Sequence, residues 1–290
     1  MPNISERCLL VSLNIGRWSA KKQDKEVTRF VEEQHDAHDA GRFNKNLLPA
    51  DVLKKIVEVS GKARTFFYKH TLPWGKQGEY ILPSELYEEF ANEIRQIKGE
   101  YAEQVKAFLQ LYEDYKDNAK TTLGRLYKET DYPSVTQLTR KFYLDIKYGL
   151  VSSKDDFRVN LAQEYIDELK EAIEEQKMHS IAIATQEIWD RISEKLRNVV
   201  EKLGDEDANF KDSLVGNVRE LIDLLPALNI TDDPVIHEAI SDMKSLFAEP
   251  GITPEELRLD SLLRSDKARE AQGILDKFGD YMQEPLAMIT

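Results

Sequence analysis

The chain has 290 residues, of which 41% are hydrophobic and 32% are charged, with 13 Gly and 10 Pro. This length leaves ample chain to bury a core, and the composition excludes collagen-like and low-complexity proteins and favours a helix-rich soluble one. The formal net charge of −13 is unevenly spread, since residues 1–150 carry 24 Lys and Arg against 22 Asp and Glu, whereas residues 151–290 carry 16 against 31.

The N-terminal part of the sequence predicts a strand followed by two helices. Apolar residues alternate with others over 8–15, which is the pattern of a half-buried strand. A short helix is expected at 24–37, with Asp24 as its cap, and a longer one at 51–70. The Leu-Pro-Trp-Gly sequence at 72–75 ends the second helix.

The middle of the sequence predicts two long helices joined by strands. Apolar positions in 84–126 recur about every 3.64 residues, which predicts one nearly straight helix roughly 60 Å long. Alternation over 138–150 predicts a second strand, which Phe157 and Val159 extend as a hairpin. The second long helix is expected at 161–203 and ends at a glycine.

These elements predict a mainly α fold. We expect a long antiparallel helical hairpin, similar to a coiled coil, with a small antiparallel β-sheet at one end and a compact helical C-terminal region. Shorter helices in that region are expected at 209–225, 234–247 and 253–282. The charge pattern divides the chain into domains at 1–160 and 161–290, unless the whole chain forms one continuous elongated domain.

The sequence predicts a cytoplasmic protein, in the host cytoplasm if a phage encodes it. Cys8 is the single cysteine, so no disulfide and no cysteine-based zinc site can form within one chain. The N-terminal region lacks the hydrophobic run and cleavage site of a signal peptide, and no stretch approaches the roughly 20 apolar residues of a membrane span.

No catalytic signature is evident, so neither an enzyme nor a cofactor is expected. The sequence lacks a Walker A motif, GxSxG and HExxH, and Cys8 has no identifiable histidine partner. His35 and His38 share a helix face but lack a third metal ligand, so no metal site is predicted. Asp232 and Asp233 could hold magnesium as an acidic pair, but capping of the next helix explains Asp233 better.

Basic and aromatic residues interleave at two places in the N-terminal half. Single-stranded nucleic acid needs cations for its phosphates and ring faces for its bases, so these stretches are candidates for such a site. The competing interpretation places the aromatic rings, including Trp18, in the core. The candidate residues are Arg17, Trp18, Lys21, Lys22, Lys62, Arg64 and Lys69.

Four stretches of the sequence stand out together: VSLNIGRWSAKKQD at 11–24, LPW…GEYILP at 72–83, DDFRVNL at 155–161 and FKDSLVGNVRELIDLLPALNITDDP at 210–234. These stretches resemble an uncharacterised domain family of phage and bacterial genomes whose genes often lie near those for a MoxR-type ATPase. The resemblance implies a phage or mobile-element origin and an ATPase-linked assembly. Within the third stretch, Asp155, Asp156, Phe157 and Arg158 are candidate interaction residues.

The function expected from these observations is non-catalytic. Long amphipathic helices commonly bury their apolar stripe against a partner, so we expect a homo-oligomeric assembly or interaction factor, with a MoxR-type ATPase as a partner implied by the resemblance. One alternative is a single-stranded nucleic-acid-binding or annealing protein of phage recombination or replication. A second alternative is that the acidic half mimics DNA and inhibits a host enzyme.

Overall fold

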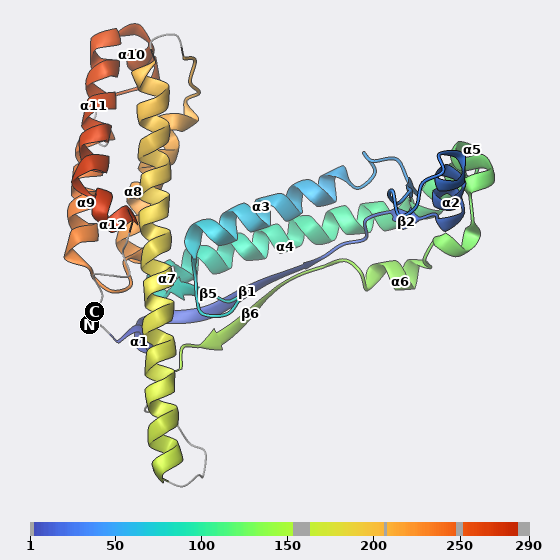
Figure 1. Cartoon of the computed structure of the whole chain (residues 1–290), viewed down its shortest axis with the longest axis horizontal. Coiled ribbons are helices and arrows are strands. Elements are labelled where there is room, and N and C mark those ends of the chain that lie inside the picture. Colours follow the sequence, from blue (N-terminus) through green and yellow to red (C-terminus); the bar gives the residue numbers. More distant parts are fainter. Residues whose placement is uncertain (1–2, 153–162, 206–207, 248–251, 284–290) are drawn as a thin grey trace. The chain divides into compact units, whose positions relative to one another are not determined.

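The computed structural model describes residues 3–152, 163–205, 208–247 and 252–283 of the chain (Figure 1). This described part is mainly helical and contains a small antiparallel sheet of four strands. The predicted mainly α fold is therefore confirmed.

The chain divides into two units, each assembled from separate stretches of sequence. Unit 1 comprises residues 1–12, 68–90 and 148–290, and unit 2 comprises residues 13–67 and 91–147. This division differs from the boundary expected near residue 160, because both units draw on the N-terminal half. Unit 1 carries 19 Lys and Arg against 36 Asp and Glu, whereas unit 2 carries 21 against 17. Acidic and basic character thus separates more clearly by unit than by half of the sequence.

The main sheet has the strand order β4-β5-β1-β6. β1 pairs antiparallel with β5, which places Cys8 opposite Pro83 and Val11 opposite Tyr80. The strand predicted at 8–15 is confirmed, whereas the one predicted at 138–150 begins later because residues 135–139 form a helix. The hairpin extension expected at Phe157 and Val159 lies outside the described residues. The four strands are β1 (Cys8–Gly16), β4 (Leu72–Pro73), β5 (Tyr80–Pro83) and β6 (Tyr143–Leu150).

Unit 2 contains a second, two-stranded sheet beside a short helix. β2 (Lys21–Gln23) pairs antiparallel with β3 (Asn44–Asn46). Asp24 caps α2 (Lys25–Gln34) by accepting hydrogen bonds from the backbone N–H groups of residues 26 and 27, as the sequence predicted. The longer helices that lie wholly or partly in unit 2 are α3 (Lys54–His70), α4 (Tyr87–Gln110) and α5 (Tyr112–Leu123), and the short ones are η2 (Gly124–Leu126), η3 (Glu129–Asp131) and α6 (Val135–Thr139).

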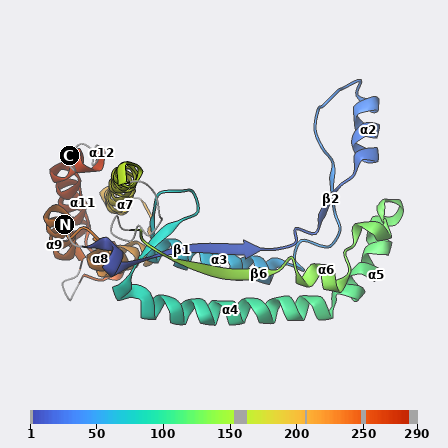
Figure 2. The same ribbon diagram turned by 90° about the horizontal axis from the view of Figure 1, so that it is seen from below.

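The single straight helix predicted for 84–126 is wrong, because the chain bends at Leu111. The residues before α4 form the turn η1 (Ser84–Leu86), and the Leu111 N–H donates to the Phe108 carbonyl oxygen, three residues back instead of four. The rings of Phe108 and Tyr112 are both buried with centroids 5.9 Å apart, while Leu111 is 46% exposed. Figure 2 shows α5 turning away from the axis of α4. Packing of both rings into one core therefore outweighs continuous helical hydrogen bonding.

A buried ion cluster around Lys45 holds several segments of unit 2 together. Lys45 Nζ lies 3.0 Å from Asp24 Oδ2 and 2.8 Å from Asp131 Oδ2, and it donates to the carbonyl oxygen of Leu126 at 2.8 Å. The hydrogen bond from Lys45 is the main cause that keeps the pKa of Asp24 below its usual value. The cluster therefore joins β3 and the start of α2 to η2 and η3.

Unit 1 is built around the long helix α7 (Gln163–Gly204), close to the predicted 161–203. α7 packs chiefly against α11, and the two helices run antiparallel, since Gly204 lies near Ala268 and Trp189 lies near Phe278. An antiparallel helical pair is thus present, but it joins α7 to α11 and is not the predicted pair of helices at 84–126 and 161–203. The other helices of unit 1 are α1 (Ile4–Arg7), α8 (Ser213–Leu228), α9 (Pro234–Phe247), α10 (Pro254–Leu259), α11 (Ser261–Lys277) and α12 (Gly279–Gln283).

Candidate interaction surface

The N-terminal end of α7 extends beyond the part of the helix that packs in unit 1. Residues 163–179 are each exposed or half-buried, and the first buried residue of the helix is Ser180. Figure 1 shows this end as the yellow-green stretch of α7. At 1.5 Å per residue, the 17 residues form a rod about 25 Å long. Such a rod offers its sides to other molecules.

Four apolar residues of this end lie on one face, and we name them the α7 stripe: Tyr165, Ile166, Leu169 and Ile173. Tyr165 is 55% and Leu169 is 39% exposed, and the two isoleucines are half-buried. Their spacing of three and four residues places them within an arc of about 100°. Because each residue turns the helix by about 100°, Leu169 is rotated by roughly 140° from Ile192, which lies at the middle of the buried face. Ser180 and Ala184 are buried further along α7 and lie in line with Ile173, so the stripe continues one edge of the buried face beyond the packed part of the helix.

Acidic residues surround the α7 stripe. Residues 163–179 contain six Asp and Glu but two Lys, so this end of the helix has a net charge of −4 when His179 is neutral. Lys177 is also close to Glu174, with Nζ and Oε1 3.6 Å apart. The end of α7 is consequently an acidic amphipathic helix. The acidic residues are Glu164, Asp167, Glu168, Glu171, Glu174 and Glu175.

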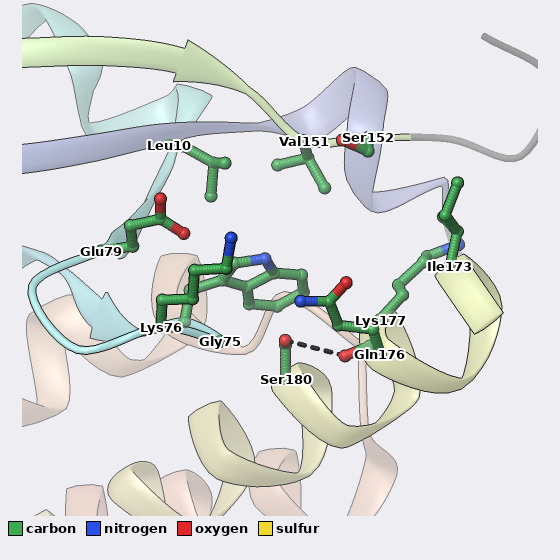
Figure 3. A pocket seen from close by; sticks show the side chains of 11 residues that line it. Leu10, Gly75, Lys76, Glu79, Val151, Ser152, Ile173, Gln176, Lys177 and Ser180 are labelled. Atoms are coloured by element: carbon green, nitrogen blue, oxygen red, sulfur yellow. Dashed lines mark hydrogen bonds between the residues drawn. The ribbon is translucent and has the colours of Figure 1, made fainter. Parts of the chain in front are cut away.

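A pocket of about 250 Å³ lies at the base of the α7 stripe and shares Ile173 with it. Figure 3 shows Lys76 and Glu79, from the connection between β4 and β5, facing Lys177 and Ser180 of α7 across the pocket. The connection approaches α7 closely at Gly75, whose φ is +57° and where an added Cβ would lie 3.2 Å from Ser180 Oγ. A side chain at that position would be strained and crowded.

Arg191 attaches α7 to the end of α3 and the start of β4. Its guanidinium donates to the carbonyl oxygens of Tyr68 at 2.7 Å, Lys69 at 3.1 Å and Thr71 at 2.7 Å, and to Glu187 Oε1 at 2.8 Å. These contacts satisfy carbonyl groups at the C-terminal end of α3, where a helix lacks internal partners. These hydrogen bonds fix the packed part of α7 in unit 1, and the projecting end continues from it.

The structure brings together some of the predicted nucleic-acid-binding residues but not others. Arg17 and Arg64 both lie close enough to Tyr101 to oppose the effect of burial, which raises the pKa of that phenol to about 12. Lys62 is bound to two carboxylates, with Nζ 3.3 Å from Glu93 Oε1 and 3.0 Å from Glu100 Oε1.

Three further candidates differ in their placement. Lys21 and Lys22 are exposed on β2 in unit 2. Lys69 belongs to unit 1, where it forms an ion pair with Glu220. The expected set is therefore divided between two units.

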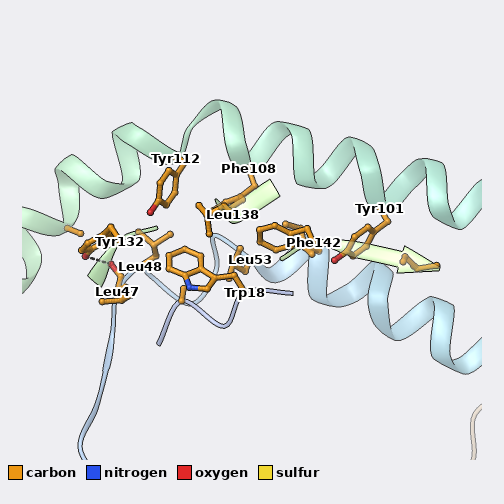
Figure 4. Packing of buried hydrophobic residues seen from close by; sticks show 14 of the residues in the cluster. Trp18, Leu47, Leu48, Leu53, Tyr101, Phe108, Tyr112, Tyr132, Leu138 and Phe142 are labelled. Carbon is orange, nitrogen blue, oxygen red and sulfur yellow. Dashed lines mark hydrogen bonds between the residues drawn. The ribbon is translucent and has the colours of Figure 1, made fainter. Parts of the chain in front are cut away.

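Trp18 lies in the core of unit 2 and is 8% exposed, which confirms the core interpretation of this ring. Its indole meets the ring of Tyr112 edge-on, with centroids 5.9 Å apart. Figure 4 shows Trp18 among Phe108, Leu53 and the other buried side chains of this core. A ring enclosed in this way has no face available for stacking on a base.

The predicted interaction residues and the acidic pair Asp232 and Asp233 remain to be placed. Asp155, Asp156, Phe157 and Arg158 lie outside the described residues. Asp233 caps α9, because its Oδ1 accepts a hydrogen bond from the Val235 N–H at 2.8 Å, as expected. Asp232 Oδ1 lies 2.7 Å from His237 Nε2.

Burial raises the pKa of Cys8 to about 12, so its thiol is protonated at neutral pH and is a poor nucleophile. Within the described ranges, no group of three or more His, Cys, Asp or Glu side chains is arranged to hold a metal ion.

The sequence predicted the helix that carries Tyr165, Leu169 and Ile173 but assigned that helix to a long helical hairpin. The excess of acidic residues around these positions is the signal that could have indicated exposure, because charges are seldom dense beside a buried seam. None of the described helices has the length and apolar character needed to cross a membrane. No protein-family model, curated protein or solved structure matches this chain.

Proposed function

We propose that this chain is a non-catalytic interaction factor that assembles with partners through the α7 stripe. The observation that supports the proposal is the exposure of Tyr165 and Leu169, with two half-buried isoleucines beside them, on one face of a projecting helix end. Contiguous exposed apolar residues with a polar surround are typical of protein contact sites. Burial of one leucine-sized side chain contributes about 1.5–3 kcal/mol, so a partner helix that covers the stripe gains a substantial part of its binding energy there.

The chemistry of this helix end indicates what the partner offers. An apolar strip with basic residues beside it would match both the stripe and its acidic flanks. The family resemblance adds a MoxR-type ATPase as an expected partner, and copies of this chain itself are another, in the cytoplasm of a bacterium or of a phage-infected host. The protein would then be an adaptor in an ATPase-linked assembly, with no reaction of its own.

The test compares Leu169→Glu with Leu262→Glu in the full chain. Leu262 is 77% exposed on α11, so the control makes the same chemical change on another exposed helix position. Sedimentation measures self-association, and surface-based binding measures affinity for the purified MoxR-type ATPase from the same genome. We expect L169E to lose association by at least tenfold while L262E behaves as the original chain. The proposal fails if neither kind of association responds to L169E.

Single-stranded nucleic-acid binding is a second candidate, favoured by one observation in unit 2. Arg17 and Arg64 both act electrostatically on Tyr101, and unit 2 has more basic than acidic residues. Arg17→Glu with Arg64→Glu should then weaken binding of a fluorescent oligonucleotide, and the binding should fall steeply with salt. Lys62→Glu serves as a comparison, because Lys62 already pairs with two glutamates. Binding that is absent at low salt would rule this candidate out.

A further inference from the structure

Unit 2 carries an apolar groove of about 640 Å³ beside α4. We name it the α4 groove. Its apolar lining comes from α4, α6 and the residues at the start of β6, all within one unit. The apolar lining residues include Tyr101, Val105, Leu109, Val135, Phe142 and Leu144.

The rim of the α4 groove is basic along α4. Lys98 and Lys106 both line it, and Lys98 Nζ is 3.0 Å from Asp145 Oδ1 on the opposite side. The lining residues of α4 extend from Lys98 to Gln110, which corresponds to about 18 Å of helix. The α7 stripe extends from Tyr165 to Ile173, about 12 Å, so the groove is long enough to receive it.

We propose that the α7 stripe of one copy of this chain docks into the α4 groove of a second copy. This inference rests on the proposed function and names the partner surface. The two surfaces match in apolar character and in length, and they are opposite in charge. The end of α7 contains six acidic residues against two lysines, whereas the groove lining contains two lysines against Asp145, which Lys98 contacts, and so has a net charge of +1. Opposite charges steer the two surfaces together and favour this pairing over others.

Pairing of two α7 ends with each other is disfavoured by the same charges. Each end has a net charge of −4, so two stripes brought face to face would place like charges beside one another. A groove with lysines along its rim avoids that repulsion. Because the contact joins two different surfaces, every copy has one of each to offer, and association continues head to tail into a ring or a filament.

The test uses two variants that each block one surface. Leu169→Glu blocks the stripe, and Ala102→Glu places a carboxylate at the α4 groove, where Ala102 is exposed and helical. The matched control for the second is Ala107→Glu, on the same helix at an exposed position outside the groove lining. Circular dichroism confirms that all variants are folded. Light scattering after size exclusion then gives the mass of each variant alone and of equimolar mixtures.

We expect the original chain and A107E to form assemblies larger than a dimer, and L169E and A102E to be monomers when alone. Mixing the two blocked variants should produce a dimer and nothing larger, because one intact stripe and one intact groove remain between them. A mixture that stays monomeric, or an A102E variant that assembles normally, overturns the inference. If A102E assembles but L169E does not, the proposed function stands and its partner surface lies elsewhere. If the original chain is monomeric at every concentration, head-to-tail docking is refuted. The proposed function is then tested by the binding of the chain to the ATPase alone.

Discussion

Replacement of Lys45 by methionine would remove the one cation from the buried cluster of unit 2. Methionine fills most of the space of the lysine stem but leaves the carboxylates of Asp24 and Asp131 and the carbonyl of Leu126 without their shared donor. Removal of one partner from a buried ion pair costs about 3–5 kcal/mol. We expect K45M to lower the free energy of unfolding by an amount within this range. The loss does not exceed it, because one of the two carboxyl groups can take up a proton and so lose its buried charge.

Two substitutions of Asp24 separate its charge from its role as a helix cap. Asp24→Asn keeps an oxygen that can accept from the N–H groups of residues 26 and 27, and Lys45 keeps Asp131, so we expect a loss of about 1.5–3 kcal/mol. Asp24→Ala removes the cap as well and should cost about 1 kcal/mol more. The expected order of destabilisation is therefore K45M, then D24A, then D24N.

Hydrogen exchange followed by mass spectrometry measures these losses locally. Peptides that cover 21–46 and 124–132 report on the cluster, and peptides from 181–203 of α7 report on unit 1. A loss of 3–5 kcal/mol corresponds to exchange that is about 100-fold to several-thousand-fold faster for amides that exchange through opening of the cluster. If K45M exchanges within about tenfold of the original chain over 21–46, the cluster contributes little and the reasoning is refuted.

Three further outcomes are expected. Because Lys45 holds the folded-state pKa of Asp24 below its usual value, the stabilisation from Asp24 is complete above the unfolded pKa of about 3.9 and is lost as the pH falls through the folded value. Hydrogen exchange over 21–46, corrected for intrinsic rates, should therefore accelerate in acid, and the part of this acceleration that comes from Asp24 should be missing in D24N. If D24N accelerates in acid as much as the original chain, this pH dependence does not come from Asp24. Since burial raises the pKa of Cys8 to about 12, iodoacetamide at pH 8 should alkylate the folded chain far more slowly than the chain in urea, and equal rates would argue against burial. Arg191→Lys should lower the urea-unfolding free energy by about 2–3 kcal/mol, because lysine carries its donors on a single nitrogen, whereas Arg191 contacts three carbonyl groups and Glu187 through three separate nitrogens; the exposed Arg197→Lys is the control, and equal effects would dismiss the anchoring role.

Elements with strong local signals were predictable from the sequence. The strand after Cys8, the cap at Asp24 and the long helix ending at Gly204 follow from alternation, capping chemistry and periodicity, which act over a few residues. The bend at Leu111 was not predictable, since it depends on how Phe108 and Tyr112 pack around the indole of Trp18, a residue some 90 positions away in the sequence.

The C-terminal end of α8 is a second point at which the structure differs from the prediction made from local sequence. α8 continues through Pro226 to Leu228, although the sequence placed its end before the proline. Leu225 and Leu228 are both fully buried, so hydrophobic packing keeps the last turn helical despite the missing N–H.

The sequence predicts which residues share a face at the candidate site, but not whether another part of the protein covers that face. Periodicity identifies Tyr165 and Leu169 as one face of a helix, but it carries no information on whether another element covers that face. The same limit applies to the predicted nucleic-acid-binding residues. Their types suggested a nucleic-acid surface, while their distribution between two units depends on contacts between distant parts of the chain.

The interleaving of the two units along the chain has a consequence for folding during synthesis. All stretches of unit 2 are available once residue 147 has left the ribosome, whereas unit 1 joins residues 1–12 to helices near residue 277. Contacts that span most of the chain form slowly, because the ends of a long loop must first meet. Unit 2 should thus complete its core early. At that stage the end of β1 that belongs to unit 2 is folded, whereas its other end and α7 still lack partners from the C-terminal helices, until α11 emerges. During that interval the nascent chain presents the apolar face of α7 that α11 later buries, and this is the stage at which a chaperone would be needed most.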